Sequence, residues 1–520
     1  MSLSDALCRS YLDLRWHFDP AAATTAGAAG QDDRLGRFDD ASVREHLAAF
    51  RAIEAGVEEL AVEDAADELD RTALLDDIRV TIFRLQHESP HRKNPAFWLL
   101  HLCEALHGIL ARAGEPAEAR AGSALARLRA TPEFLRTAAA TLAEPPEVLV
   151  DAARALVDLT ADLITRVIDA VGAGLDGRRA ELALAGAEAE AALARFRLAL
   201  DTDLSRHADE HAPAVGEDQF ERLLHHMHAV RAGAPELWRY VLHLEEETEQ
   251  VLNELGAPGS WRDVIGGRIA AAMQADAIPA ARAELERIQD FLATADLLPM
   301  ERSLPTVETL PAHLLPFTGH AVYQAGSVEA PTRDAQLWIA PWASTAAWIS
   351  QVVAEAGVPG LHLQGARAAR PGPEIRRHLS SRLLRGGWGL YAVELLEEAG
   401  YWPTAAERIL VRSHLLLRAL LGRIDIGLHT RRMSPDEAAA LLVERLPLEP
   451  THAQAMVYGC CLEPTQAIGA LIGRRELIRL REDRRQAGGE EFSSVRHHDE
   501  VLGYGSLPVP LIRWGMGLDE

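Results

Sequence analysis

The 520-residue chain has little lysine, cysteine or aromatic residue, and it has no long apolar run. Every one of its 53 basic residues except Lys93 is an arginine. Schiff-base catalysis would therefore have to use Lys93, which makes lysine-dependent covalent chemistry a poor hypothesis. The arginine bias, together with abundant alanine, glycine and proline, is typical of a GC-rich, actinomycete-like bacterial genome.

Only four cysteines occur, and none forms a CxxC pair: Cys8, Cys103, Cys460 and Cys461. This number in so long a chain excludes a disulfide scaffold. The first residues, Met1 to Asp5, lack the basic and apolar parts of a signal peptide. No apolar run reaches the roughly 18 residues of a membrane span. We therefore expect a cytoplasmic protein without a membrane partner.

Positive charge is also in deficit, because the formal net charge is −24. Nucleic acids and anionic membranes both attract basic surfaces, so neither is expected as a main partner. The excess of acidic residues favours solubility.

Helical periodicity dominates the chain before residue 299. Apolar residues recur three and four positions apart over residues 41–83, 101–130, 147–171 and 178–206. A further helix is expected after Gly216, as far as the loop at 231–235, and helix again to about residue 295. No repeat of 20–50 residues occurs, which weighs against a solenoid.

Residues 299–345 differ from the rest, because they are rich in proline, threonine and aromatic residues. Short runs at 321–323 and 336–339 predict a few strands. Helices resume from residue 346, and Ser434 begins one of them with a capping box that Glu437 completes. We expect a mainly α fold in one domain, 1–520, with a helical part (1–298), an extended or β insertion (299–345) and a second helical part (346–520).

Common catalytic templates are missing from the sequence: it has no GxSxG elbow, no P-loop and no GxGxxG that opens a helix. Cys460-Cys461 could supply a nucleophile or could be a small buried pair. His225 and His228 share a helix face with Glu221 one turn before. That set could hold a metal ion, or it could form a solvated or packed face.

Several fragments occur in the order of a known family. Gly27 and Asp33-Arg34-Leu35 match its N-terminal pattern, as does the segment 92–95. Residues 425–430 read DIGLHT, and 498–508 contain His-Asp and Gly-Ser-Leu-Pro. On these fragments the chain resembles a widespread bacterial family of unknown function whose members are similar to gluzincin zinc peptidases.

The family's signature, HEAYPGHHLQ followed by EGWALYAE, aligns here with residues 355–364 and 386–393. In such a site two histidines and a later glutamate hold zinc, and a glutamate beside the first histidine takes a proton from the bound water. The resemblance places Glu355, Leu361 and Gly386 at the ligand positions and Ala356 at the base. Ala470 stands where the family has a catalytic tyrosine. The chain should therefore not be a zinc peptidase, and neither a metal nor a cofactor is expected.

Three functions remain open. The first is a metal-independent enzyme that acts on an amino-acid- or peptide-derived small molecule in specialised-metabolite (antibiotic) biosynthesis. The second is a non-catalytic pseudo-peptidase that binds a ligand or a partner subunit, and the third is a metallohydrolase with a rebuilt site. For the enzyme, the candidate catalytic residues are Glu355, His362, Tyr391 and His429. The candidate substrate-binding residues are Tyr323, Gln364, Trp388, Glu394, Asp425 and His498.

Asp425 and His429 lie four positions apart, so on a helix they would share a face. A structural hydrogen bond explains this pair at least as well as acid–base chemistry. Glu355 keeps a titratable group where a histidine stands in the family, which favours redirection of the site over simple decay.

The purified protein is predicted to carry no stoichiometric zinc, since Glu355, Leu361 and Gly386 replace the three ligands. Elemental analysis of the protein checks this. A value near one zinc per chain, bound in this region, would contradict the proposed loss of the site.

Overall fold

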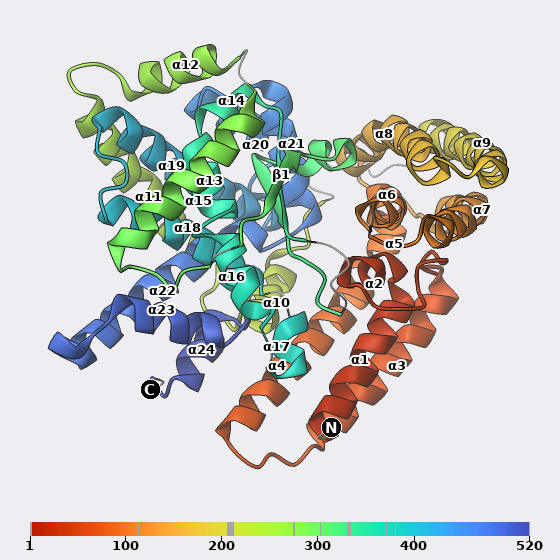
Figure 1. The fold of residues 1–520 in the computed structure, drawn as a ribbon, viewed down its shortest axis with the longest axis horizontal. Helices are drawn as coiled ribbons and strands as arrows, with labels where there is room; N and C mark the ends of the chain where they lie inside the picture. The colour runs from red at the N-terminus through yellow and green to blue at the C-terminus, as the bar shows by residue number, and fades with distance from the viewer. Residues whose placement is uncertain are drawn as a thin grey trace. The chain divides into compact units, whose positions relative to one another are not determined.

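The computed structural model describes residues 3–112, 114–204, 213–273, 276–301, 303–329, 334–370, 372–379 and 381–518 (Figure 1). Contacts group the chain into two compact units. Unit 1 consists of Met1–Ala61, Leu74–Pro213 and Gly326–Asp334, and unit 2 of Val62–Ala73, Ala214–Ala325 and Ala335–Glu520. The expectation of one domain over 1–520 stays a prediction.

Unit 1 is built from helices that pack in pairs, α1 against α3, α6 against α8 and α7 against α9. Residues of α4 up to Ala73 are grouped with unit 2. The helices are α1 (Leu3–Phe18), α2 (Pro20–Ala26), α3 (Asp40–Glu58), α4 (Ala65–Phe83), α5 (Pro90–Lys93), α6 (Pro95–Ala111), α7 (Ala117–Thr141), α8 (Glu147–Gly172) and α9 (Asp176–Leu198), with π-helical turns at Arg84–Glu88 and Ala199–Asp203.

The periodic segment 147–171 is confirmed as one helix, α8. Two other periodic segments each contain a break. Residues 41–83 form α3 and α4, because the Asp64 carboxylate accepts the backbone N–H groups of Ala66 and Asp67 and so starts a new helix. Residues 101–130 span α6 and α7, and Pro116 precedes the second. Periodicity continued across both breaks and concealed them.

Unit 2 contains the remaining helices and the small sheet. The helices are α10 (Glu217–His228), α11 (Ala234–Gly256), α12 (Trp261–Ala272), α13 (Ala277–Ala295), α14 (Ala343–Ala347), α15 (Ile349–Ala356), α16 (Leu361–Ala368), α17 (Glu374–His378), α18 (Arg382–Glu398), α19 (Ala405–His429), α20 (Pro435–Arg445), α21 (Pro450–Leu462), α22 (Gln466–Gly488), α23 (Ser494–Gly503) and α24 (Val509–Gly515), with 3-10 turns at Ala312–Phe317 and Gly489–Glu491.

The three strands are β1 (Thr306–Thr309), β2 (Ala321–Gln324) and β3 (Gln336–Ile339), in the order β1-β3-β2. β1 runs parallel to β3 and β2 antiparallel to it, so that both Val307 and Tyr323 pair with Leu337. Leu337 is fully buried. The mainly α fold with a small β insertion is therefore confirmed, and β2 and β3 coincide with the two runs that the sequence indicates.

Helices α18, α19 and α22 pack against one another in the centre of unit 2 (Figure 1). The closest approach is between α18 and α22. A Cβ atom on Gly473 would lie 1.9 Å from the Leu383 carbonyl oxygen, and one on Gly387 would lie 2.4 Å from the Gly473 carbonyl carbon. Only glycine permits two helix backbones to meet this closely.

The predicted capping box at α20 is confirmed. The Ser434 hydroxyl accepts the Glu437 backbone N–H, and the Glu437 carboxylate accepts the Ser434 backbone N–H at 2.8 Å. Both donors at this helix start are thereby paired.

Within the described part of the chain, no single helix has the length and apolar character needed to cross a membrane. The pair Pro450–Leu462 and Gln466–Glu491, bent by 83°, meets the length and composition test together.

Asp425 on α19 caps the start of α22. Its carboxylate accepts the backbone N–H groups of Thr465, Ala467 and Ile468 at 3.0, 3.0 and 3.1 Å, and the side chain is fully buried. The carboxylate thereby joins two of the central helices.

Substituting Asp425→Ala leaves three backbone donors without a partner, two of them buried, so we expect the free energy of unfolding to fall by about 2–4 kcal/mol. Asp276→Ala is the control, because that exposed cap of α13 accepts one N–H, from Ile278. It should cost about 0.5–1 kcal/mol. Urea unfolding measures both, and equal losses in the two variants would contradict this role for Asp425.

Candidate functional site

Glu355, near the end of α15, lies in the interior of unit 2 with its charge neutralised. Its carboxylate forms an ion pair with the guanidinium of Arg418, and His414 Nε2 lies 3.3 Å from Oε2. His414 and Arg418 are one turn apart on α19. Gly389 of α18 leaves room for this arrangement, because a Cβ atom there would lie 2.9 Å from Glu355 Cγ.

His414 begins a row of three buried imidazoles, which we call the histidine row: His414, His320 and His452. The His320 ring centroid lies 6.0 Å from that of His414 and 4.9 Å from that of His452. Burial lowers the pKa of all three, that of His414 to about 4. The three rings are therefore neutral at pH 7.

Each ring of the histidine row has an Nε2 atom without a hydrogen bond among the described residues. The Nδ1 atoms of two rings are bonded, since His320 meets the Thr345 hydroxyl at 3.0 Å and His452 meets the Ser344 hydroxyl at 2.8 Å. Within the described residues, the three rings do not bring one nitrogen each to within 4.8 Å of the other two. The histidine row is therefore too widely spread to hold a metal ion as a close ligand group.

The positions that the resemblance assigns to zinc do not fit a metal ion. Arg418 places a positive charge on Glu355, the first position, and Leu361 has no donor atom. At the third position, a Cβ atom on Gly386 would lie 2.7 Å from Ala470 Cβ. A glutamate at residue 386 would need the space that α22 fills.

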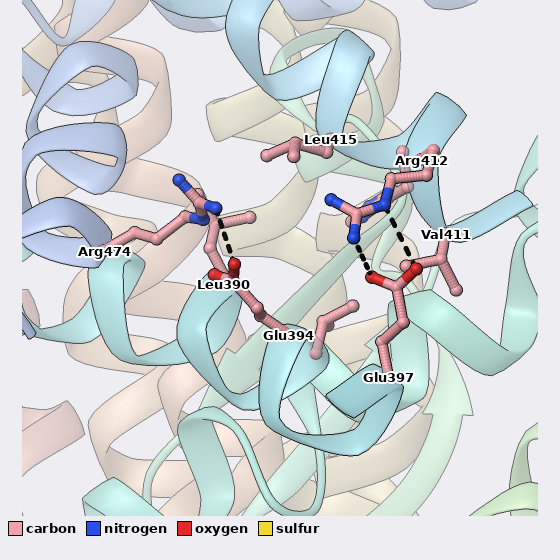
Figure 2. A pocket seen from close by; sticks show the side chains of 9 residues that line it. Leu390, Glu394, Glu397, Val411, Arg412, Leu415 and Arg474 are labelled. Atoms are coloured by element: carbon pink, nitrogen blue, oxygen red, sulfur yellow. Dashed lines mark hydrogen bonds and ion pairs between the residues drawn. The ribbon is translucent and has the colours of Figure 1, made fainter. Parts of the chain in front are cut away.

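A small cavity lies beside His414, between α18, α19 and α22 (Figure 2). Its volume is about 20 Å³, and roughly 10–15 Å³ is needed for one water molecule. Two ion pairs line it, Arg474 with Glu394 at 2.9 Å and Arg412 with Glu397 at 2.9 Å. Glu394, a predicted substrate-binding residue, is therefore engaged by an arginine.

His362 of α16 and Tyr323 of β2 form a second group. The rings are 5.7 Å apart, and His362 Nε2 donates to the Ser303 carbonyl at 2.8 Å. Burial lowers the pKa of His362 and raises that of Tyr323 to about 12. Both side chains are therefore neutral near pH 7.

Tyr391, Trp388 and His498 form a third group. The His498 Nδ1–H donates to the Leu297 carbonyl at 2.9 Å, so its Nε2 accepts the Tyr391 hydroxyl at 2.8 Å. Trp388 packs on both rings and donates its indole N–H to the Pro359 carbonyl. Burial lowers the pKa of His498 to about 3. These groups hold one another in place.

Asp425 and His429 form a fourth group, with His429 Nε2 3.9 Å from the carboxylate. His429 donates to the Cys460 carbonyl at 3.0 Å. Burial raises the pKa of Asp425 to about 7 and lowers that of His429 to about 4. Burial also raises the pKa of both Cys460 and Cys461, that of Cys461 to about 12, so neither is a ready thiolate nucleophile.

Among the described residues, no hydrogen bond, ion pair or ring contact joins any two of Glu355, His362, Tyr391 and His429. Gln364 donates to the Ser506 hydroxyl at 2.9 Å. The assigned catalytic and substrate-binding roles stay predictions.

Sequence reasoning missed His414, Arg418, His320 and His452. A weak signal was present for two of them, because a histidine and an arginine four apart interrupt an apolar run in α19. The other two come from separate segments, and nothing in the sequence places them beside Glu355.

The histidines of α10 do not share an environment. His225 is exposed, whereas His228 is buried with its Nε2 3.1 Å from the Thr465 hydroxyl. Glu221 accepts the Ala234 backbone N–H at the start of α11. The packed and solvated helix face is the interpretation that these contacts favour.

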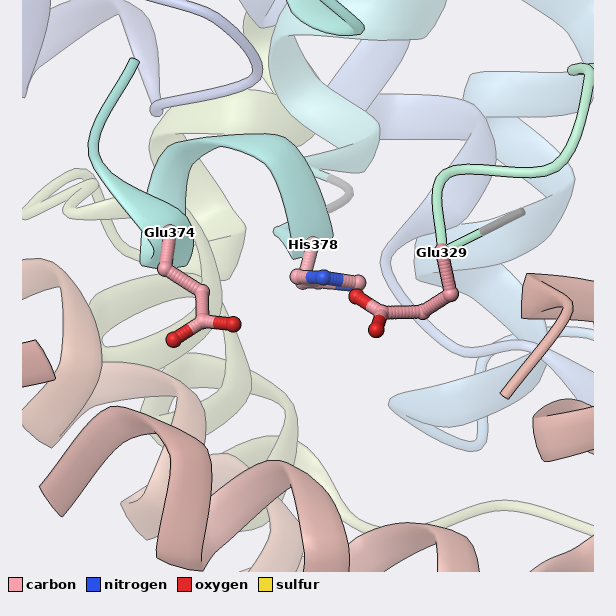
Figure 3. Close-up of side chains that lie close together, drawn as sticks. All are labelled: Glu329, Glu374 and His378. Carbon is pink, nitrogen blue, oxygen red and sulfur yellow. The ribbon is translucent and has the colours of Figure 1, made fainter. Parts of the chain in front are cut away.

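Figure 3 shows Glu374 and His378, which lie one turn apart on α17 in unit 2. Glu329, also drawn, belongs to the segment of unit 1 and pairs with Arg9. Because the side chains belong to different units, we assign them no common site.

The chain matches the family described as "Bacterial protein of unknown function (DUF885)" over residues 20–516. Two solved structures share its fold. One, a "putative lipoprotein of unknown function" from Shewanella oneidensis, has a TM-score of 0.78 at 17% identity and covers 99% of this chain and 100% of its own. The other, from Colwellia psychrerythraea, is also named a "putative lipoprotein", with a TM-score of 0.81 at 16% identity and 99% coverage of each chain. No curated protein matches.

The prediction of a cytoplasmic location is corrected by these structures. It rested on the absence of a signal-peptide pattern at the first residues and on the absence of an apolar run long enough to span a membrane. Both proteins that share the fold are named as lipoproteins, which contradicts it.

The histidines predict how stability changes with pH. His414, His429 and His498 have pKa values lowered to about 4, 4 and 3, below the ordinary 6.5. Between pH 6.5 and 4 these three residues therefore bind more protons in the unfolded chain than in the folded one. The free energy of unfolding should fall as the pH falls through this range.

Urea unfolding at several pH values checks this, with His414→Gln and the exposed His225→Gln compared with the parent protein. The slope against pH should be shallower in His414→Gln and unchanged in His225→Gln. Equal slopes in all three proteins would show that burial of His414 does not disfavour its protonation.

Proposed function

Because this chain belongs to the DUF885 family of bacterial proteins, we propose that it is a non-catalytic member that binds a ligand or partner on a peptidase-like helical scaffold. The observation that carries the proposal is the closed site around Glu355. The titratable group that replaces a ligand in the resemblance is held in an ion pair, and the neighbouring cavity has a volume of about 20 Å³.

The state of Glu355 opposes catalysis there. A general base needs a free lone pair within reach of a substrate proton. Arg418 holds one carboxylate oxygen of Glu355, and the other, which has no hydrogen bond among the described residues, is buried 3.3 Å from His414 Nε2.

The small volume of the cavity beside His414 also opposes catalysis at the Glu355 site. Sites for small molecules occupy roughly 300–1,000 Å³, whereas the cavity beside His414 has room for about one water molecule. The ion pairs of Glu394 and Glu397 with arginines line this space. A substrate would have to break them to enter.

The framework of unit 2 is maintained although the site is closed. Asp425 keeps three hydrogen bonds to the start of α22, and Ser434 keeps a complete capping box. These caps stabilise the scaffold of unit 2. A stable scaffold is what a binding protein requires, so they are consistent with the proposed function.

The histidine row favours a second candidate function, the metal-independent enzyme. Three neutral imidazoles with unpaired Nε2 atoms extend from the Glu355 carboxylate to Ser344. Neutral histidines can accept and pass protons. This candidate requires the Arg418 ion pair to open when a substrate binds.

Turnover separates the two candidates. The parent protein, Glu355→Gln and the surface control Glu476→Gln would each be incubated with a peptide mixture and with a small-molecule extract of bacterial cells. Untargeted mass spectrometry would follow the products, and circular dichroism would check each fold. We expect no product above the protein-free blank from any of the three.

Any product made by the parent protein would overturn the non-catalytic proposal. Loss of that product in Glu355→Gln, with retention in Glu476→Gln, would assign the activity to the Glu355 site and favour the enzyme.

A further inference from the structure

A second pocket of unit 2, whose lining does not include Glu355, contains several arginines. It lies between α16, α17 and α23 and has a volume of about 210 Å³. Four arginines line it, together with one acidic residue: Arg367, Arg370, Arg376, Arg377 and Asp499. We call it the arginine pocket. In a chain with a net charge of −24, such a concentration of positive charge stands out.

Part of this charge is compensated. Arg367 pairs with Asp499, and Arg376 pairs with Asp70 at 2.5 Å. Arg370, about half exposed, lies 4.0 Å from Glu301, which is a weak contact. The remaining arginine, Arg377, has no ion pair among the described residues. The pocket therefore keeps an excess of positive charge.

Donor groups in the pocket are also unused. The Arg367 side chain is 8% exposed, and its Nε–H has no hydrogen-bond partner in the part of the chain that the structure describes. The buried Nε–H of Arg377 likewise has none within the described residues. A buried donor without a partner costs free energy, which an acceptor bound in the pocket would recover.

An apolar groove continues from the arginine pocket. Its volume is about 400 Å³, and Arg376 and Gly503 line both spaces. Its walls include Leu69, Tyr504 and Trp514. The Arg376 guanidinium lies 5.6 Å from the centroid of the Tyr504 ring, so charge and aromatic surface meet at the junction. We call this space the aromatic groove.

We propose that the arginine pocket binds the phosphate or carboxylate group of a small molecule whose apolar body lies in the aromatic groove. Guanidinium groups match both anions through paired N–H donors. A concave site with a few charged groups beside aromatic walls is the usual form of a small-molecule site. The inference rests on the proposed binding function and names the class of ligand.

Isothermal titration calorimetry on the full chain tests the proposal with four probes. Phenyl phosphate and 3-phenylpropanoate carry both features, inorganic phosphate carries only the charge, and 3-phenylpropanol carries only the apolar body. We expect the first two to bind more tightly than the last two. The stronger of the first pair identifies the anionic group.

Three variants locate the site. Arg377→Gln should weaken binding of the better aromatic anion about tenfold or more, because a charge-assisted contact is lost. Trp514→Ala should weaken the same probe and leave inorganic phosphate unchanged. Arg479→Gln, at an exposed position of α22 outside the pocket, should change neither. Circular dichroism checks that each variant is folded.

Equal affinity for the alcohol and the anions, no binding of any anion, or full binding by Arg377→Gln would each overturn the proposal. None of these results bears on turnover at Glu355. Conversely, turnover that depends on Glu355 would remove the proposed non-catalytic function and leave the binding results of the arginine pocket as they are.

Discussion

The contact between α18 and α22 is the constraint on which the centre of this protein depends. Gly387 and Gly473 bring the two backbones so close that a Cβ atom on either would overlap the other helix. This crossing also sets Gly386 against Ala470, the positions at which the resemblance has a metal ligand and a tyrosine. Where two helices meet at this distance, small residues fill the interface and little volume is left between the backbones. The closed site follows from the packing.

Arginine balances the buried acids that surround this contact. Glu355 and Glu394 are paired with Arg418 and Arg474, and Glu397 with Arg412. Burying a carboxylate is costly unless a cation accompanies it, and the planar guanidinium is suited to such pairs. The arginine pocket differs, because there the acidic partners are fewer than the arginines. Ion pairs between arginine and carboxylate therefore neutralise the centre of unit 2. In the arginine pocket, the arginines outnumber their acidic partners, which is the basis of the proposed anion site.

Much of the fold could be predicted from hydrophobic periodicity and from local capping signals. The helix at 147–171, the strands at 321–323 and 336–339 and the capping box at Ser434 depend on residues close together in sequence, and all are present. The breaks within 41–83 and 101–130 were missed because apolar spacing continued through them. The cytoplasmic location rested on two absences, of a signal-peptide pattern and of a long apolar run, and was wrong.

By itself, the sequence determined the mainly α fold and the place of the small sheet, because both follow from residue type and local spacing. Tertiary structure decided the surroundings of every candidate side chain. Glu355 meets Arg418 and His414 from a helix some sixty residues later, and His320 joins them from the edge of the sheet. Glu355, His362, Tyr391 and His429 are buried in separate groups. Ion pairing and burial act between segments distant in the chain, so only the folded protein sets which carboxylate is free and which cavity stays open.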